Sequence, residues 1–454
     1  MALFLKECKT IGKSIIYIVF ILAMLLFYDT QIGSYAKDDV AQYNSYAEIP
    51  EGVPFSSPAP VYNNPLIKPR EGEESYGYKY EEIPQEIMTT VIASLVLDWN
   101  QNNYLIYPPP IYIGRHAKLN DDKQAKIAQI ITDATGISVK EVLDIVIARN
   151  VEAMDNDPSE IQIYYDRVGY SDVIPIVITY EEYKEKMKQV DKILGGGYSG
   201  STFSMNETVP RTYEEALSEY NESISYDKTS GAYARLFCDY MGILAALLSV
   251  FVPVAFLMRD KRAKANEVIF SRNISSIKFI SVRYIAMVFM MVVPFILLSL
   301  IPSMYLIKFG FDNNLPVDIF AFVKYIIVWI LPTLMTTTAV AFIVTAITDT
   351  PLAIVIQFLW SFISVAVGAF AAHEGNTGDL IHYGMNLILR HNTLDNLQYY
   401  RDNLTQIAIN RGFYAILSVV LVALTIFIYE QKRRGEVDVR GSLLKIFRNR
   451  KGAD

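Results

Sequence analysis

Six apolar runs constrain the fold of this chain more than any other feature of its sequence. The five later runs are each close to the ~20 residues that cross the hydrocarbon core of a bilayer as a helix, and the first run has 14. Hydrophobic residues make up 52 % of the 454 residues and are concentrated in these runs. The runs occupy residues 15–28, 241–258, 284–306, 325–347, 351–372 and 412–429. The sequence therefore predicts an integral membrane protein with an all-α bundle of six transmembrane helices.

The distribution of charge predicts which parts of the chain face the cytoplasm. Residues 29–235 contain 18 Lys and Arg against 33 Asp and Glu, whereas the rest of the chain contains 23 against 15. Basic residues gather before the first run, at 259–283, and from Lys432 to Lys451. Because short basic loops remain in the cytoplasm, we expect a multi-pass cell-membrane protein with both termini cytoplasmic. Residues 31–235 are then extracellular, and their acidity excludes nucleic-acid binding by this part.

The first apolar run has a second interpretation. A basic start, a 14-residue apolar run and the sequence Ser34-Tyr35-Ala36 resemble a secretory signal followed by its cleavage site. Cleavage would leave five helices with the same extracellular and cytoplasmic parts, so the charge distribution does not distinguish the two. We expect an uncleaved helix.

The extracellular segment is predicted to contain a folded domain of mixed type. Short β-like runs fall between helical patterns, and this alternation favours a small α/β or α+β domain. Both cysteines, Cys8 and Cys238, lie at or in the membrane, so we expect no disulfide in this domain. The expected helices are 84–101, 120–135, 139–150 and 181–194, and the expected strands are 111–113, 161–165 and 173–179.

No group of residues in the sequence predicts catalysis. Gly12-Lys13-Ser14 resembles the end of a nucleotide-binding P-loop, but Glu7 occupies the position of the first glycine and an apolar run follows. A membrane-bound hydrolase would need a nucleophile–base pair or a metal-binding set, and the sequence indicates neither. We therefore expect a chain that is not an enzyme, with no cofactor and no metal. The four histidines have no metal-ligand spacing: His116, His373, His382 and His391.

Residues 1–14 are predicted to form an amphipathic interfacial helix on the cytoplasmic face of the membrane. Its apolar side would hold Leu3, Phe4, Leu5, Cys8 and Ile11, and its polar side would hold Lys6, Glu7, Lys9 and Lys13.

The few polar residues near or within the apolar runs are candidates for a substrate path. Lys324 either reaches the outer interface or faces the bundle interior, where it would be such a candidate. Thr336 and Thr337 either bond to their own backbone or line a polar seam. Asp239 begins the second crossing, and we expect lipid headgroups to hydrate it.

Residues 259–287 are too long and too polar for a turn between two membrane helices. Residues 263–270 favour a helix with an apolar patch, which either docks on a soluble partner or rests on the lipid surface. The sequence Glu267-Val268-Ile269-Phe270-Ser271, followed by Ile274-Ser275, resembles the loop after the second helix in ABC-2 type (NatB-like) ABC transporter permeases. Lys264 stands where that family usually has Gly, and Asn273 replaces its Pro.

The layout of the whole chain is similar to that family as well, with a large extracellular domain between transmembrane helices 1 and 2. The resemblance implies a type V ABC exporter-like bundle. The expected organisation is an interfacial helix at 1–14, transmembrane helix 1 at 15–30, an extracellular domain at 31–235, transmembrane helix 2 at 236–258, a cytoplasmic coupling-helix region at 259–277, transmembrane helices 3–5 at 278–373, an extracellular loop at 374–411, transmembrane helix 6 at 412–430 and a basic cytoplasmic tail at 431–454.

The resemblance implies the permease subunit of a bacterial ABC exporter. A separate cytoplasmic ATPase would hydrolyse ATP, a second permease subunit would complete a homodimer or heterodimer in the lipid bilayer, and a peptide, drug, lipid or ion would move outward. The implied ATPase-coupling residues are Arg262, Lys264, Glu267, Val268, Ile269, Phe270, Ser271 and Arg272, and the possible substrate-path residues are Lys324, Thr336 and Thr337.

A different class of protein shares the same helix layout. Surface receptors and secretion-apparatus components, similar to the phage-infection protein or to the accessory membrane subunit of type VII secretion, also have one crossing, an outside domain and five further crossings. They have no ATPase partner, and their outside domains are usually much longer than residues 31–235.

Overall fold

The computed structural model describes residues 2–50, 64–73, 75–106, 114–156, 169–198, 207–263, 274–371, 383–394 and 396–434. The chain divides into two compact units. The membrane unit comprises Met1–Gly77, Thr212–Gly368 and Asp379–Asp454, and the second unit comprises Tyr78–Arg211 and Ala369–Gly378.

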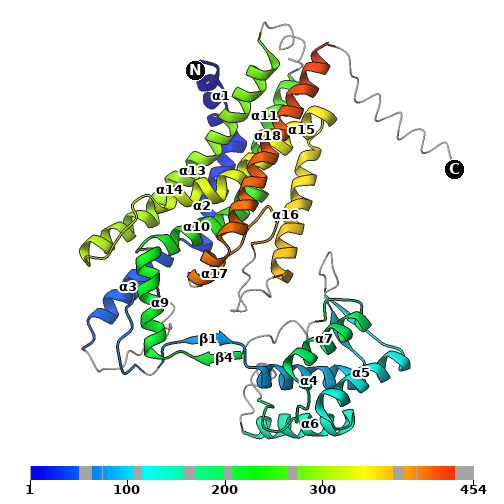
Figure 1. The fold of residues 1–454 in the computed structure, drawn as a ribbon. Coiled ribbons are helices and arrows are strands. Elements are labelled where there is room, and N and C mark those ends of the chain that lie inside the picture. Colours follow the sequence, from blue (N-terminus) through cyan, green and yellow to red (C-terminus); the bar gives the residue numbers. More distant parts are fainter. Residues whose placement is uncertain are drawn as a thin grey trace, which may run out of the picture. The chain divides into compact units, whose positions relative to one another are not determined.

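The described part of the membrane unit is built from helices (Figure 1). In chain order they are α1 (Ala2–Gly12), α2 (Ile15–Gln31), α3 (Tyr35–Ala47), α9 (Tyr213–Tyr226), α10 (Gly231–Leu247), α11 (Phe251–Arg262), α13 (Ser276–Asp312), α14 (Ala321–Tyr325), the π-helical turn η4 (Ile326–Ile330), α15 (Leu331–Thr348), α16 (Leu352–Ala371), α17 (Leu397–Asp402) and α18 (Leu404–Arg434).

Within the described residues, five helical spans are long and apolar enough to cross a bilayer, as expected of a multi-pass helical membrane protein. They are Ile15–Ala47, Gly231–Arg262, Ser276–Asp312, Ala321–Thr348 and Leu404–Arg434. The remaining expected crossing, 351–372, coincides with α16, whose described apolar stretch, Leu352–Val365, is shorter. A bundle of six crossings therefore stays a prediction.

The long helix α13 shows how the bundle is packed. Met287, Met291 and Phe295 are buried at spacings of four residues, whereas Ile285 and Phe289 on another face are exposed. Residues four apart lie on the same face of a helix, so one stripe packs on neighbouring helices and the other remains apolar and uncovered. A helix with apolar side chains on its uncovered face is suited to contact with lipid.

One end of the membrane unit collects the termini of five helices. Arg283, in the first turns of α13, pairs with Glu7 of α1. Asp349, which follows the last residue of α15, accepts hydrogen bonds from Lys261 of α11 and Lys432 of α18. Figure 1 shows these helix ends together. We name this end the basic end, because α11 and α18 both finish on basic residues here.

The second unit is mostly helical around its own apolar core. Its elements are β1 (Tyr78–Glu81), α4 (Pro84–Gln101), β2 (Tyr104–Ile106), β3 (Arg115–Ala117), α5 (Asp121–Thr135), α6 (Val139–Asn156), α7 (Tyr180–Leu194) and β4 (Glu207–Pro210). The strands form two antiparallel pairs, β1 with β4 and β2 with β3. The four predicted helices are all present as α4, α5, α6 and α7.

Local signals explain why these helices begin and end where they do. The side chains of Asn120 and Thr179 accept hydrogen bonds from the backbone at the starts of α5 and α7. Gly136 and Gly195 follow the two helices with φ of 74° and 98°. Polar N-caps and a left-handed glycine after the last turn are the strongest boundary signals for helices.

The strand predicted at 173–179 is wrong, because these residues form no strand. Ile174 is buried in the core, whereas Val177 is exposed and its backbone N–H donates to Ala134 at the end of α5. Pro175 lies between them and has no N–H to donate to a neighbouring strand. The other two predicted strands, 111–113 and 161–165, lie outside the described residues.

The second unit is also smaller than the predicted extracellular domain, 31–235. Residues on both sides of it pack with the membrane unit instead. In α3, the Tyr43 ring meets Phe309 of α13 at 4.7 Å, and Asp39 accepts a hydrogen bond from the Tyr233 hydroxyl at 2.6 Å. Helix α3 therefore continues the first apolar helix rather than beginning a separate domain.

Candidate functional site

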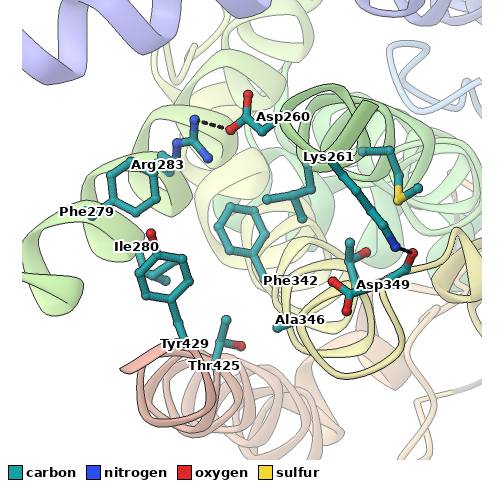
Figure 2. A pocket seen from close by; sticks show the side chains of 13 residues that line it. Asp260, Lys261, Phe279, Ile280, Arg283, Phe342, Ala346, Asp349, Thr425 and Tyr429 are labelled. Carbon is teal, nitrogen blue, oxygen red and sulfur yellow. Dashed lines mark hydrogen bonds and ion pairs between the residues drawn. The ribbon is translucent and has the colours of Figure 1, made fainter. Parts of the chain in front are cut away.

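A small pocket lies at the basic end between α11, α13, α15 and α18 (Figure 2). Its volume is about 100 Å³. The inner wall is apolar and includes Phe279, Ile280 and Phe342, whereas Asp260 and Lys261 contribute charged groups. Ligand pockets for whole small molecules usually have roughly 300–1,000 Å³, so this pocket is a gap between helix ends and not a site for a transported peptide or drug.

Arg283 is the central charged residue of the pocket. Its guanidinium lies 2.6 Å from the carboxylate of Asp260 on α11 and 3.4 Å from that of Glu7 on α1. The guanidinium also stands over the rings of Phe279, at 4.3 Å, and Phe256, at 5.2 Å. One largely buried cation therefore connects three helices through two carboxylates.

Asp349 provides the second connection at the pocket. It has φ of 52° and follows the last turn of α15. Its backbone oxygen accepts from Lys261, as Figure 2 shows, and its carboxylate lies 2.9 Å from Lys432 of α18. In addition, Arg433 of α18 donates to the Ile274 carbonyl at 3.0 Å, just before α13. Polar contacts thus join all four helices that surround the pocket.

The segment that connects α11 with α13 contains the predicted coupling residues. Arg262 is exposed at the last residue of α11, next to the charged groups of the pocket. The other predicted coupling residues lie outside the described residues: Lys264, Glu267, Val268, Ile269, Phe270, Ser271 and Arg272.

The three predicted substrate-path residues do not lie together. Lys324 is 63 % exposed and pairs with Asp318 at 2.6 Å, which agrees with an interfacial position. Thr337 donates to the Thr333 carbonyl of its own helix, whereas Thr336 donates across the bundle to the Tyr414 carbonyl of α18. None of them lines the pocket, and only Thr336 forms part of a polar seam between helices.

A buried segment between α16 and α18 was not expected from the sequence. Residues 383–394, within the predicted extracellular loop 374–411, pack into the membrane unit. Leu387 and Ile388 are buried against Ala246, near the middle of the span Gly231–Arg262, and against Tyr414 of α18. We name residues 383–394 the buried segment.

Two ion pairs lie on successive turns of α10, and both contact the buried segment. Asp239 is 0 % exposed, pairs with Arg390 at 3.1 Å and accepts the backbone N–H groups of His391 and Asn392. One turn earlier, Arg235 pairs with Asp227, which precedes α10, and donates to the Leu394 carbonyl of the buried segment at 3.4 Å. Hydration of Asp239 by headgroups is therefore wrong, because charged and backbone donors from the buried segment replace water.

Arg411 binds the other end of the buried segment without a carboxylate. Its guanidinium donates to the carbonyls of Leu387, at 3.0 Å, and Trp329, at 2.9 Å, and to the Thr333 hydroxyl at 2.9 Å. Its Nε donates to Asn410 Oδ1 at 2.8 Å. The residue is only 4 % exposed, and no ion pair to it is found among the described residues. Trp329 belongs to the π turn, a distortion that is frequent at functional sites.

The sequence contains one signal that could have revealed the buried segment. Arg235, Asp239 and Arg411 are charged residues of opposite sign next to apolar runs, and such residues in membrane proteins usually pair with one another or with carbonyls. The pairing of Asp239 cannot be read from spacing, because its partner Arg390 lies 151 positions further along the chain.

Comparisons with protein-family models, with curated proteins and with solved structures found no match to this chain. Within the described residues, no group of three or more His, Cys, Asp and Glu is placed to hold a metal ion.

Proposed function

We propose that this chain is the permease subunit of an ABC-type exporter, in which a separate cytoplasmic ATPase drives outward transport of a peptide, drug, lipid or ion. The observation that carries the proposal is the set of buried contacts at the basic end. Residues 264–273 follow α11 and precede α13 in the sequence, and Arg283 joins α13 to α11 and to α1.

These contacts hold several membrane helices together, as is required if a bound ATPase is to move them as a group. Because Arg283 and Glu7 are buried, Asp260 is half-buried and all three are ion-paired, α1, α11 and α13 resist separation. Asp349 extends the connection to α15 and α18. A partner that binds residues 264–273 and changes its own state would therefore bias the arrangement of several membrane helices at once.

The buried segment supports a transport function from inside the bundle. Irregular backbone at membrane depth is tolerated where it is buried in protein or lines a water-filled cavity. Residues 383–394 are held by polar bonds to Asp239 and Arg411 rather than by apolar contacts alone. Polar bonds of this kind can be exchanged for water or cargo, so the segment is suited to closing a path through the bundle.

The test is co-purification of the tagged chain from its native host in a gentle detergent, with every co-purifying protein identified. We expect an ATPase of the ABC type in near-equal amount. Arg262→Glu combined with Val268→Asp, or a proline within 265–270, should remove the ATPase while the chain still inserts into the membrane.

The matched control is Lys308→Glu, which changes an exposed charge near the other end of α13. This variant should retain the ATPase. Retention of the ATPase by the Arg262 and Val268 variant would refute the assignment of 259–277 as the coupling region. Absence of any ATPase from the wild-type preparation would favour the receptor or secretion class.

A further inference from the structure

Helix α1 is oriented differently from the amphipathic pattern expected from its sequence. Glu7 and Ile11 are buried, and the Phe4 ring meets Phe289 of α13 at 5.6 Å. Glu7, which was expected on the polar side, faces Arg283, whereas Leu5, expected on the apolar side, is 58 % exposed. The side of α1 that packs on protein is thus the one that holds Glu7 and Ile11, whereas Leu5 remains on the outer face.

This orientation leaves a purely basic outer face. Lys6, Lys9 and Lys13 are all exposed, and no ion pair to them is found among the described residues. The only acidic residue of α1, Glu7, is turned inward and paired with Arg283. The outer face therefore presents three positive charges and the exposed side chain of Leu5.

The position of this face is given by the helix that follows. Helix α2 begins two residues after Lys13, and its first residue, Ile15, is 78 % exposed. Val19 and Leu22 are exposed further along α2, as in a helix that faces acyl chains. The lysines therefore lie where the apolar surface of the bundle begins, which is the level of lipid headgroups.

We propose that the outer face of α1, formed by Lys6, Lys9 and Lys13 around Leu5, binds the headgroups of anionic phospholipids. A basic helix with an exposed apolar side chain fits such a surface, because lysines pair with headgroup phosphates and leucine reaches the acyl boundary. Each basic residue near an anionic surface increases partitioning by roughly fivefold. An acidic protein surface would match the charges but would gain less from an exposed leucine beside an apolar helix.

The experiment is a lipid titration of the full-length chain in detergent, followed by native mass spectrometry. The probes are phosphatidylglycerol, phosphatidylcholine and inorganic phosphate. We expect the wild-type chain to prefer phosphatidylglycerol to phosphatidylcholine by about tenfold or more, and added salt should reduce this preference because charges on an exposed face are screened.

The variant K6Q/K9Q/K13Q should lose most of the preference. It changes only exposed side chains, so the buried contacts of α1 remain. The matched control K118Q/K126Q/K188Q removes three exposed lysines from the second unit and should retain the preference.

Three outcomes would overturn the proposal. The first is an unchanged preference in K6Q/K9Q/K13Q. The second is a response to inorganic phosphate as large as that to phosphatidylglycerol, which would indicate a general anion site. The third is a variant that loses a co-purifying protein but keeps its lipid preference, which would assign the face to protein docking. The proposal does not depend on the exporter function.

Discussion

Arg411 illustrates how a single charged side chain is accommodated inside the bundle. A guanidinium has five N–H groups in a fixed plane, and here they bind oxygens from the π turn, from the buried segment and from its own helix. Backbone carbonyls are the usual alternative to a carboxylate for a charged group at membrane depth. The geometry therefore makes Arg411 a positioning residue for the buried segment.

Replacing Arg411 with Gln should lower the free energy of unfolding by about 2–4 kcal/mol, because several buried oxygens lose their donor. Arg411→Lys should recover only a part, since a lysine cannot reproduce the planar set of donors. Chemical unfolding in detergent micelles measures both changes. Arg434→Gln, at an exposed position of the same helix, is the control and should change stability by less than about 0.5 kcal/mol. Equal effects at both positions would contradict the role assigned to Arg411.

At the scale of elements, the connection between α1, α11 and α13 depends on one cation shared by two carboxylates. With Arg283 present, Glu7 and Asp260 are both compensated. Without it, the buried carboxylate of Glu7 loses this partner, and the half-buried Asp260 keeps only Arg259 at 3.6 Å. Breaking a buried ion pair costs more than replacing the whole group with neutral residues.

Arg283→Gln should therefore destabilise the chain by about 3–5 kcal/mol. Adding Glu7→Gln and Asp260→Asn to this variant should restore at least half of the loss, because no charge is then left unpaired. Unfolding of the single, double and triple variants in detergent gives the coupling free energy. If the three changes were simply additive, the helices would not be joined through Arg283.

Most elements were predictable because the signals for them are local. The four helices of the second unit have apolar periodicity. Two of them, α5 and α7, also have a polar N-cap and a closing glycine. The strand at 173–179 failed because its β-like apolar run competes with Pro175 and with packing of Ile174 into a helical core. The buried segment was missed because its contacts are with residues far away in the chain, such as Asp239.

At the scale of the whole molecule, the helix ends predict the side of the membrane on which each exposed position lies. Arg262 lies at the basic end. Lys308 lies 32 residues along α13 from the start of this helix at Ser276. A helix rises 1.5 Å per residue, so about 48 Å separates the start of α13 from Lys308. This distance exceeds the ~30 Å hydrocarbon core of a bilayer.

A single cysteine at each position should reveal this arrangement, after Cys8 and Cys238 have been replaced. We expect a membrane-impermeant maleimide to label Lys308→Cys on intact cells. Lys126→Cys, in the second unit, should also be labelled, whereas Arg262→Cys should react only after permeabilisation. The Lys and Arg residues at the basic end favour a cytoplasmic position of this end. The opposite pattern of labelling would invert the predicted topology, and labelling of all three would reject it.

The sequence by itself determined which stretches of this chain are apolar helices, where its charges gather and where most helices of the second unit begin and end. These properties follow from neighbouring residues, because hydrophobic length, periodicity and capping act over a few turns. Only the tertiary structure decided that Glu7 faces Arg283, that α3 belongs to the membrane unit and that Arg411 holds a buried segment. Those features depend on free energies of pairing between side chains far apart in the chain, which no local pattern records.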